Sequence, residues 1–215
     1  MQHCDKPVKA VLFDVDGTLI DTTEFILQAY EYTLDSENIH VPGVRKKMKE
    51  LFGMPLLDCY RILAPDHDVA RLSAIHNQWQ AENLHMVGAF PTVAETVQSL
   101  KKNGLKVATV TNRARPSTIA ILTESGIHEE IDLIIGFEDV KNPKPHPEGI
   151  LKALLYFGLE PGEVVMIGDS EFDILAGKAA QVKTIGVRTG LHPEQMEASG
   201  PDHVVERIAE IQPLL

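Results

Sequence analysis

The chain has little cysteine, no zinc-type histidine spacing and no excess of positive charge. Its two cysteines, Cys4 and Cys59, lie far apart and form no Cys-x-x-Cys pair. No two of its nine histidines stand three or four residues apart, as they would on one face of a helix. The sequence therefore gives no support for a Cys/His zinc site, and we expect a protein of the reducing cytoplasm.

Long apolar runs are also missing. No segment approaches the roughly 20 apolar residues that a membrane-spanning helix needs, and Met1 to Lys9 lacks the apolar core of a signal peptide. The formal net charge is −11, whereas proteins that bind nucleic acids or membrane surfaces usually carry a basic patch. We therefore expect neither a nucleic-acid partner nor a membrane partner.

Five short apolar segments rich in β-branched residues predict buried strands. Because they are apolar almost throughout, both faces should be buried, which is typical of a parallel sheet. Helical stretches between them end near Gly104 and Gly158, which suit left-handed C-caps. Alternation of strand and helix predicts an α/β fold with a doubly wound, Rossmann-like parallel sheet. The predicted strands are 8–13, 105–111, 131–135, 164–167 and 183–187, and the helices are 93–102 and 147–157.

Residues 19–88 carry helix signals and no convincing strand. Apolar residues recur at helical spacing behind Asp21 and Glu24, an N-cap pattern, and 69–86 forms a second long amphipathic stretch. Two short helices are expected at 44–51 and 56–63. We predict an inserted α-helical cap domain at 19–88, over a core domain made of 1–18 and 89–215. Such a cap would lie over the carboxyl ends of the strands and close on a substrate.

Two carboxylates, Asp14 and Asp16, follow the first predicted strand in the sequence Asp-Val-Asp-Gly-Thr. The carboxyl ends of parallel strands are where α/β proteins bind ligands. Burying two acids there is costly unless a cation, a proton or a ligand compensates them. We interpret Asp14 as a nucleophile that works with a divalent metal on an anionic substrate. The alternative is a turn in which the acids and Gly17 serve geometry alone.

Thr111 and Asn112 stand at the end of another predicted strand and offer a hydroxyl, an amide and backbone N–H groups to phosphate oxygens. The alternative is helix capping, by Asn112 or by Ser117. Lys144 lies between prolines, whose stiffness favours a fixed ammonium group suited to a phosphate and a carboxylate. The alternative for Lys144 is an exposed residue in a proline-rich loop.

A third strand end reads Gly-Asp-Ser-Glu-Phe-Asp from residue 168, and Asp169 is placed there to bind a metal. The alternative is a turn with a helix N-cap. Asp14, Asp16, Asp169 and Asp173 would crowd negative charge at one edge, so hard, oxygen-seeking Mg²⁺ is the natural partner.

Taken in order, these motifs resemble the haloacid dehalogenase superfamily, in its helical-cap branch of phosphoglycolate phosphatases, pyrophosphatases and β-phosphoglucomutase-like proteins. The resemblance spans nearly the whole chain. It rests on Asp14-x-Asp16-Gly17-Thr18, Thr111-Asn112, Lys144-Pro145 and Gly168-Asp169-Ser170-x-x-Asp173.

The resemblance implies that Asp14 attacks phosphorus and that Asp16 protonates the leaving oxygen and later activates water. Mg²⁺ would be bound by Asp14, the Asp16 carbonyl and Asp169, with Asp173 and Ser170 supporting the site from behind. An acid at position 16 favours phosphate esters or phosphoanhydrides over halides and phosphonates. The phosphoryl oxygens would be held by Thr18, Thr111, Asn112 and Lys144.

The main hypothesis is a Mg²⁺-dependent phosphatase acting on a small phosphorylated metabolite, such as phosphoglycolate, pyrophosphate, a sugar phosphate or a nucleotide. The alternatives are a phosphomutase, disfavoured because such relatives often carry Val where Thr18 stands, and a non-catalytic binding protein. Arg113 and the basic segment from Arg45 to Lys49 are candidate specificity contacts, or else solvated groups. Trp79 fits core packing better than a substrate platform. The sequence does not decide between a monomer and a homodimer.

Overall fold

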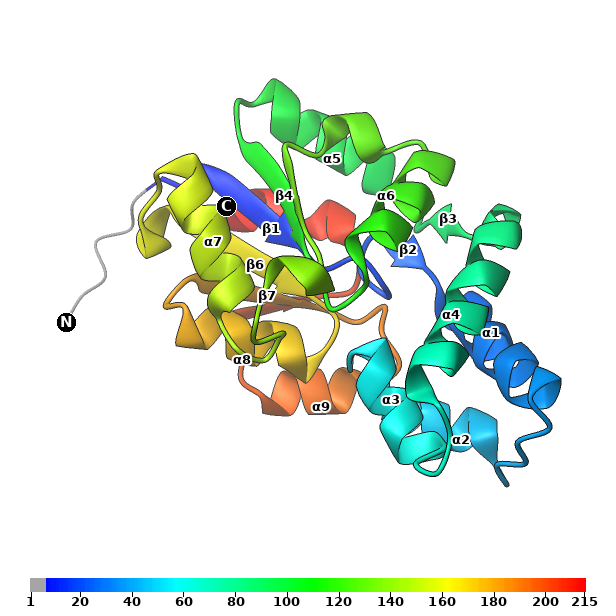
Figure 1. Ribbon diagram of the computed structural model, residues 1–215. Coiled ribbons are helices and arrows are strands. Elements are labelled where there is room, and N and C mark those ends of the chain that lie inside the picture. The colour runs from blue at the N-terminus through cyan, green and yellow to red at the C-terminus, as the bar shows by residue number, and fades with distance from the viewer. Residues whose placement is uncertain (1–6) are drawn as a thin grey trace.

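The computed structural model describes residues 7–215 and has a six-stranded parallel sheet at its centre (Figure 1). The strand order is β5-β4-β1-β6-β7-β8, and each neighbouring pair is parallel. All five predicted strands are confirmed, whereas β8 was not predicted. The strands are β1 (Ala10–Phe13), β4 (Lys106–Val110), β5 (Leu133–Ile135), β6 (Val164–Gly168), β7 (Lys183–Val187) and β8 (His203–Val205).

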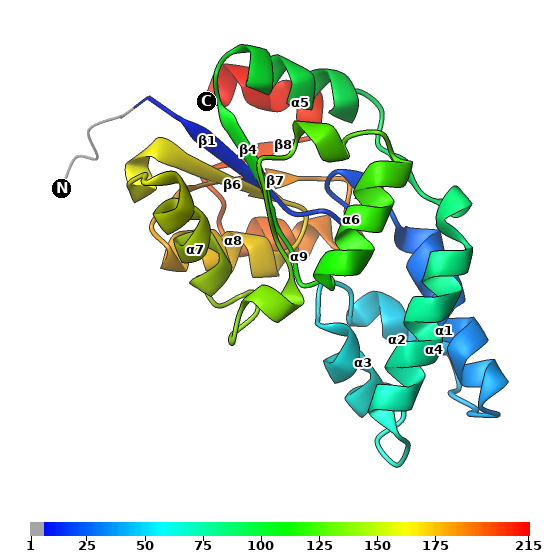
Figure 2. The ribbon, with the colours of Figure 1, turned by 45° about the horizontal axis from the view of Figure 1, so that its top comes forward.

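Helices cover both faces of this sheet (Figure 2). Alternate residues of a strand point to opposite faces, so Val11 and Phe13 pack with the helices on one side and Ala10 and Leu12 with those on the other. The predicted doubly wound α/β fold is therefore confirmed. The first side carries α5 (Val93–Lys102), α6 (Arg115–Glu124) and the 3-10 helix Ile208–Leu214; the second carries α7 (Glu148–Phe157) and α8 (Glu171–Ala179), with α9 (Pro193–Ala198) beside α8.

The chain between β1 and α5 forms four helices that lie to one side of the sheet (Figure 1). They pack around an apolar cluster of their own, which includes Leu27, Tyr60 and Leu72. Trp79 packs beside Phe25, with ring centroids 5.8 Å apart, as core packing predicts. The helices are α1 (Thr23–Ser36), α2 (Val44–Glu50), α3 (Leu56–Leu63) and α4 (Val69–Glu82).

Three details of this region differ from the sequence prediction. Two short strands are present, β2 (Ile20–Asp21) and β3 (Gly88–Ala89), paired antiparallel. The helix predicted over 69–86 ends at Glu82, because Asn83 turns back to donate a hydrogen bond to the Trp79 carbonyl at 2.8 Å, and a separate 3-10 turn follows. Asp21 lies in β2, so the N-cap position of α1 falls to Thr22.

Within residues 7–215, no helix is both long and apolar enough to cross a membrane. Cys59 is a buried free thiol, while Cys4 lies outside the described residues. The predicted glycine C-caps are present in left-handed conformation, with φ of +82° at Gly104 and +65° at Gly158. The helices α5 and α7 therefore end where the sequence places their ends.

Candidate active site

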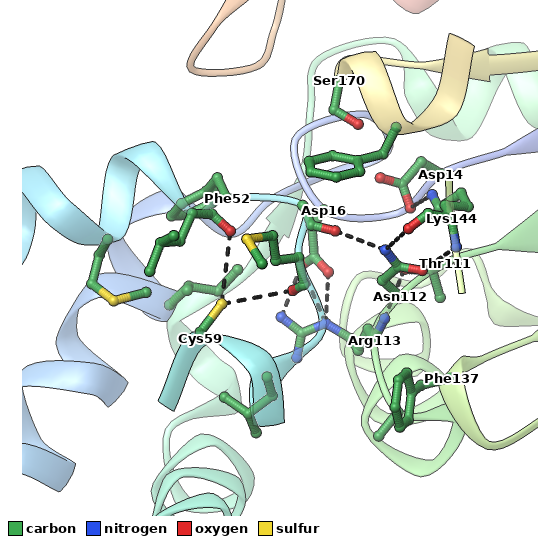
Figure 3. Close-up of a pocket in the computed structure, with 18 of the residues that line it drawn as sticks. Asp14, Asp16, Phe52, Cys59, Thr111, Asn112, Arg113, Phe137, Lys144 and Ser170 are labelled. Atoms are coloured by element: carbon green, nitrogen blue, oxygen red, sulfur yellow. Dashed lines mark hydrogen bonds and ion pairs between the residues drawn. The ribbon is translucent and has the colours of Figure 1, made fainter. Parts of the chain in front are cut away.

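A pocket of about 380 Å³ lies between the carboxyl ends of the strands and helices α1 to α4 (Figure 3). Its floor is polar and comes from the sheet, while its walls on the other side are largely apolar and come from α1 to α4 and the loops between them. A pocket of this size, with few convergent polar groups, is typical of a small-molecule site. The polar floor includes Asp14, Asp16, Thr111, Asn112, Arg113, Lys144, Asp169 and Ser170.

Asp14 and Lys144 form the buried centre of the floor. Lys144 Nζ lies 2.8 Å from Asp14 Oδ1 and 2.5 Å from Asp173 Oδ1, and all three side chains are at most 8% exposed. Burial raises the pKa of Asp14 to about 7 even though the Lys144 charge lowers it, and the Asp173 charge adds to the rise. Burial alone would lower the pKa of Lys144, but the Asp14 and Asp173 carboxylates hold it above its usual value. The lysine is therefore a fixed, charged group, as its setting between prolines predicts.

Asp169 lies against the first motif. Its Oδ1 accepts a hydrogen bond of 2.6 Å from the Thr18 hydroxyl. Gly17 has φ of +77°, and a Cβ on it would stand 2.4 Å from Asp169 Oδ2, so both the turn and the close approach require glycine. Burial, together with the charges of Asp173 and Asp14, raises the pKa of Asp169 well above its usual value.

Three buried acids thus meet at one point. Ligand oxygens of Asp14, Asp169 and Asp173 lie within 4.8 Å of one another, and among residues 7–215 Lys144 is the cation that forms ion pairs with Asp14 and Asp173. Burial and mutual repulsion raise the pKa of Asp14 and of Asp169, and a hard divalent cation would restore such carboxylates to the charged form. The donor set therefore fits such a cation. Both oxygens of Asp173 already accept from Lys144 and Ser170, which leaves Asp14 and Asp169 facing the site.

Asn112 does not cap α6, because the N-cap position is Ala114. Its amide instead ties two loops together. Asn112 Oδ1 accepts from the Lys144 backbone N–H at 2.9 Å, while Nδ2 donates to the carbonyls of Lys144 at 3.0 Å and Gly53 at 2.8 Å. Both amide hydrogens are thus used within the protein. Ser117 does not cap the helix either, and its hydroxyl accepts from Arg113. The Thr111 hydroxyl accepts from the Arg113 backbone N–H at 3.2 Å.

Asp16 is paired with Arg113, a contact the sequence did not predict (Figure 3). Arg113 Nη2 donates to Asp16 Oδ1 at 2.8 Å, and Nε donates to Oδ2 at 2.9 Å, which makes a two-pronged ion pair. Burial raises the pKa of Asp16, but the Arg113 charge and hydrogen bonds outweigh it and hold that pKa below its ordinary value. Arg113 therefore favours the charged form of Asp16 and holds its carboxyl group in one orientation.

Arg45, the other predicted specificity residue, is not among the pocket-lining residues. It is nearly half exposed and pairs with Glu24 and Glu31 at 2.9 and 2.7 Å. The lysines at 46, 47 and 49 are also exposed. In this structure the basic segment is a solvated helix face.

We expect Arg45→Met to leave kcat/KM unchanged and to lower the free energy of unfolding by no more than about 1 kcal/mol, because exposed ion pairs contribute little. Steady-state kinetics and urea unfolding measure the two quantities. A tenfold rise in KM would show that Arg45 contacts the substrate after all.

Sequence reasoning missed the pocket residues that come from α1 to α4 and the loops between them. Among them are His76 and Gln80, which stand four residues apart on α4 and are buried. Polar residues at that spacing within an amphipathic helix are a signal, since they share one face. The apolar walls on this side include Leu51, Phe52, Met54 and Leu57, while Phe137 from the 3-10 helix Phe137–Asp139 and Phe172 from α8 add apolar surface from the other side.

The parallel sheet with acids at its carboxyl edge places the protein among the α/β enzymes that carry out their chemistry at that edge. A model of the haloacid dehalogenase-like hydrolases matches residues 11–187. The chain belongs to this family, as its motifs predict, and it is a hydrolase of the phosphatase type.

Individual relatives cover nearly the whole chain. It is 35% identical to "Pyrophosphatase PpaX" of Bacillus velezensis, over 96% of both chains, and 34% identical to the protein of that name in Halalkalibacterium halodurans, over 95% of both. A solved structure of a predicted phosphoglycolate phosphatase from Haemophilus somnus superposes with a TM-score of 0.86 at 25% identity, covering 96% of this chain and 97% of the other.

Proposed function

We propose that the protein is a Mg²⁺-dependent phosphatase that hydrolyses a small phosphorylated metabolite through an aspartyl-phosphate on Asp14. The observation that carries the proposal is the buried contact of Asp14 with Lys144, beside Asp169 at the floor of a pocket. A carboxylate nucleophile, a fixed cation for phosphoryl oxygens and a second acid for a metal are the parts that phosphoryl transfer needs.

In the first step an Asp14 oxygen attacks phosphorus, and the bond from phosphorus to the leaving oxygen breaks. The leaving oxygen takes a proton from Asp16, which has to bind this proton beforehand because Arg113 favours its charged form. Water then attacks the phosphorus, its proton passes to Asp16, and the bond to Asp14 breaks. Lys144 stabilises the negative charge on the phosphoryl oxygens in both steps. Mg²⁺, held by Asp14, Asp169 and the Asp16 carbonyl, would neutralise further phosphoryl charge.

The role of each remaining site residue follows from its contacts. Asp173 accepts from and holds Lys144, Ser170 donates to Asp173 and holds it in turn, and Thr18 orients Asp169. We propose that Thr111 and the backbone N–H groups near Asn112 bind phosphoryl oxygens. The Asn112 side chain contributes by fixing the loop that carries Lys144.

We also propose the division into a core of 1–18 and 89–215 and a cap of 19–88. Its support is the separate apolar cluster of α1 to α4 and the single β2–β3 ribbon that joins them to the sheet. The wide separation of Cys4 and Cys59 in the sequence supports a cytoplasmic location.

The pocket favours an organic phosphate monoester as the substrate. Its cap side is largely apolar, and the lysine and arginine that line it within the described residues, Lys144 and Arg113, are both paired with carboxylates. A leaving group with an apolar part therefore fits better than a second phosphate. Pyrophosphate is the second candidate, because relatives about 35% identical carry the name pyrophosphatase.

The test is inorganic phosphate release from phosphoglycolate, pyrophosphate, sugar phosphates, nucleoside monophosphates and phenyl phosphate, with Mg²⁺ or with EDTA. We expect release in Mg²⁺ to exceed that in EDTA by at least about a hundredfold, since the metal neutralises phosphoryl charge. Equal release in EDTA would contradict the metal requirement. No phosphate release, together with isomerisation of a sugar phosphate once a hexose bisphosphate primer is added, would indicate the mutase.

A further inference from the structure

The Arg113–Asp16 pair is one end of a buried chain of hydrogen bonds that runs into α4 and α3. Arg113 Nη1 donates to Gln80 Oε1 at 2.7 Å and to the Ser117 hydroxyl at 2.7 Å. The Gln80 amide nitrogen lies 3.0 Å from His76 Nε2, and His76 Nδ1 lies 3.1 Å from the Tyr60 hydroxyl. These hydrogen bonds therefore connect side chains of α3 and α4 to the Asp16 carboxyl group through Arg113.

The direction of each hydrogen bond is fixed by the arginine. A guanidinium only donates, so the oxygen of the Gln80 amide must face Arg113 and its NH₂ group must face His76. Nε2 of His76 is then an acceptor, and in a neutral ring Nδ1 carries the hydrogen and donates to Tyr60. His76 is 3% exposed, and burial with the nearby Arg113 charge lowers its pKa to about 3, so the ring is neutral.

These hydrogen bonds also leave the Arg113 side chain little freedom to move. Four of its five N–H groups are accounted for by Asp16, Gln80 and Ser117, and its side chain is 7% exposed. An arginine held in this way does not turn toward a substrate without breaking several buried hydrogen bonds. Its position suits a group that orients Asp16.

We infer that Gln80 and His76 are positioning residues, which hold Arg113 so that it presents the Asp16 carboxyl to the leaving oxygen. The inference rests on the proposed role of Asp16 as the acid. Buried polar side chains are costly unless fully hydrogen-bonded, and here each partner satisfies the next until the chain ends on Asp16. Catalytic groups tolerate small misplacement poorly, since about 1 Å can cost about a hundredfold in rate.

The test compares two phosphate esters of similar size, benzyl phosphate and p-nitrophenyl phosphate. Benzyl alcohol needs a proton in order to leave, whereas p-nitrophenolate leaves without one. The ratio kcat/KM covers the steps up to departure of the leaving group, before Asp16 acts on water. We expect Gln80→Leu to lower kcat/KM for benzyl phosphate by roughly 10- to 100-fold and that for p-nitrophenyl phosphate by less than about threefold.

Two control variants calibrate the difference between the effects on the two esters. Gln78→Leu makes the same change on the exposed side of α4 and should alter neither ester. Asp16→Asn removes the acid and should show the same selectivity as Gln80→Leu, but more strongly. If Asp16→Asn shows no selectivity, or if the wild-type protein hydrolyses neither ester, the proposed function fails. If Asp16→Asn is selective and Gln80→Leu slows both esters equally or slows neither, only the present inference is overturned.

A conservative variant tests the direction of the chain. Gln80→Glu keeps an acceptor toward Arg113 but turns an oxygen toward His76, so the ring must move its hydrogen to Nε2, and the Tyr60 hydroxyl must donate to Nδ1. We expect this variant to restore most of the benzyl phosphate activity that Gln80→Leu loses. Nitrogen NMR of the histidines should show the Nδ1–H form in the wild type and the Nε2–H form in Gln80→Glu. An Nε2–H form in the wild type would overturn the inference.

Discussion

Asp14→Asn is expected to fold normally and to lose at least about a thousandfold in kcat, because an asparagine amide cannot form the acyl-phosphate. The two side chains have nearly the same shape, and Lys144 keeps Asp173 as a partner at 2.5 Å. Phosphate release measures the loss, and circular dichroism with a thermal melt measures the folding.

Asp66→Asn is the matched control, since Asp66 is exposed and lies outside the pocket lining. It should behave as the wild type does. A folded Asp14→Asn protein that retains a tenth of the wild-type rate would refute the nucleophile assignment. A variant that melts far below the wild type would show that Asp14 is needed for folding, and the rate would then have to be interpreted with Asp14→Glu.

Lys144→Met is expected to lose activity and also to lower the free energy of unfolding by about 3–5 kcal/mol, because removing one partner leaves buried charges unpaired. The charges in question are Asp14 and Asp173, which both contact the ammonium. Urea unfolding in EDTA measures the loss, and the equivalent change at exposed Lys141 should cost little.

The free energy of unfolding that Lys144→Met loses should depend on pH. Burial already raises the pKa of Asp14 to about 7, and without the lysine it rises further, so the folded variant binds protons more readily than the unfolded chain does. The loss should therefore shrink as the pH falls from about 8 to about 6. A loss that is constant across this range would show that packing of the lysine stem, and not charge, is responsible.

The central fold could be predicted because its strands are buried on both faces and thus apolar throughout, as in residues 164–167. The strand β8 escaped prediction because it is a three-residue edge strand in which Val204 is 38% exposed, so its pattern is weak. The ribbon of β2 and β3 has only two residues on each side, which is too short for any periodicity.

Sequence reasoning identified the site residues that follow the strands, but it did not identify the side chains and loops that contact them. Asp14, Asp16, Lys144 and Asp169 meet because the carboxyl ends of parallel strands share an edge, which sequence order alone implies. The pairing of Arg113 with Gln80 depends on how α4 packs over the sheet, and the bond from Asn112 to Gly53 depends on a loop of the insertion. No local pattern encodes such contacts between distant segments.

The β2–β3 ribbon allows the helical segment between its two strands to be removed or exchanged as one unit. Ile20 pairs directly with Ala89, so the chain leaves the sheet layer and returns to it at points about 5 Å apart. A two-residue turn can close a gap of that width. Residues 22–87 could therefore be excised, or exchanged for the equivalent segment of a relative, with both cut points already in register. Engineering new selectivity on this scaffold then becomes a matter of transplantation, provided that the exchanged segment supplies the contacts that Gln80 and Gly53 make with Arg113 and Asn112.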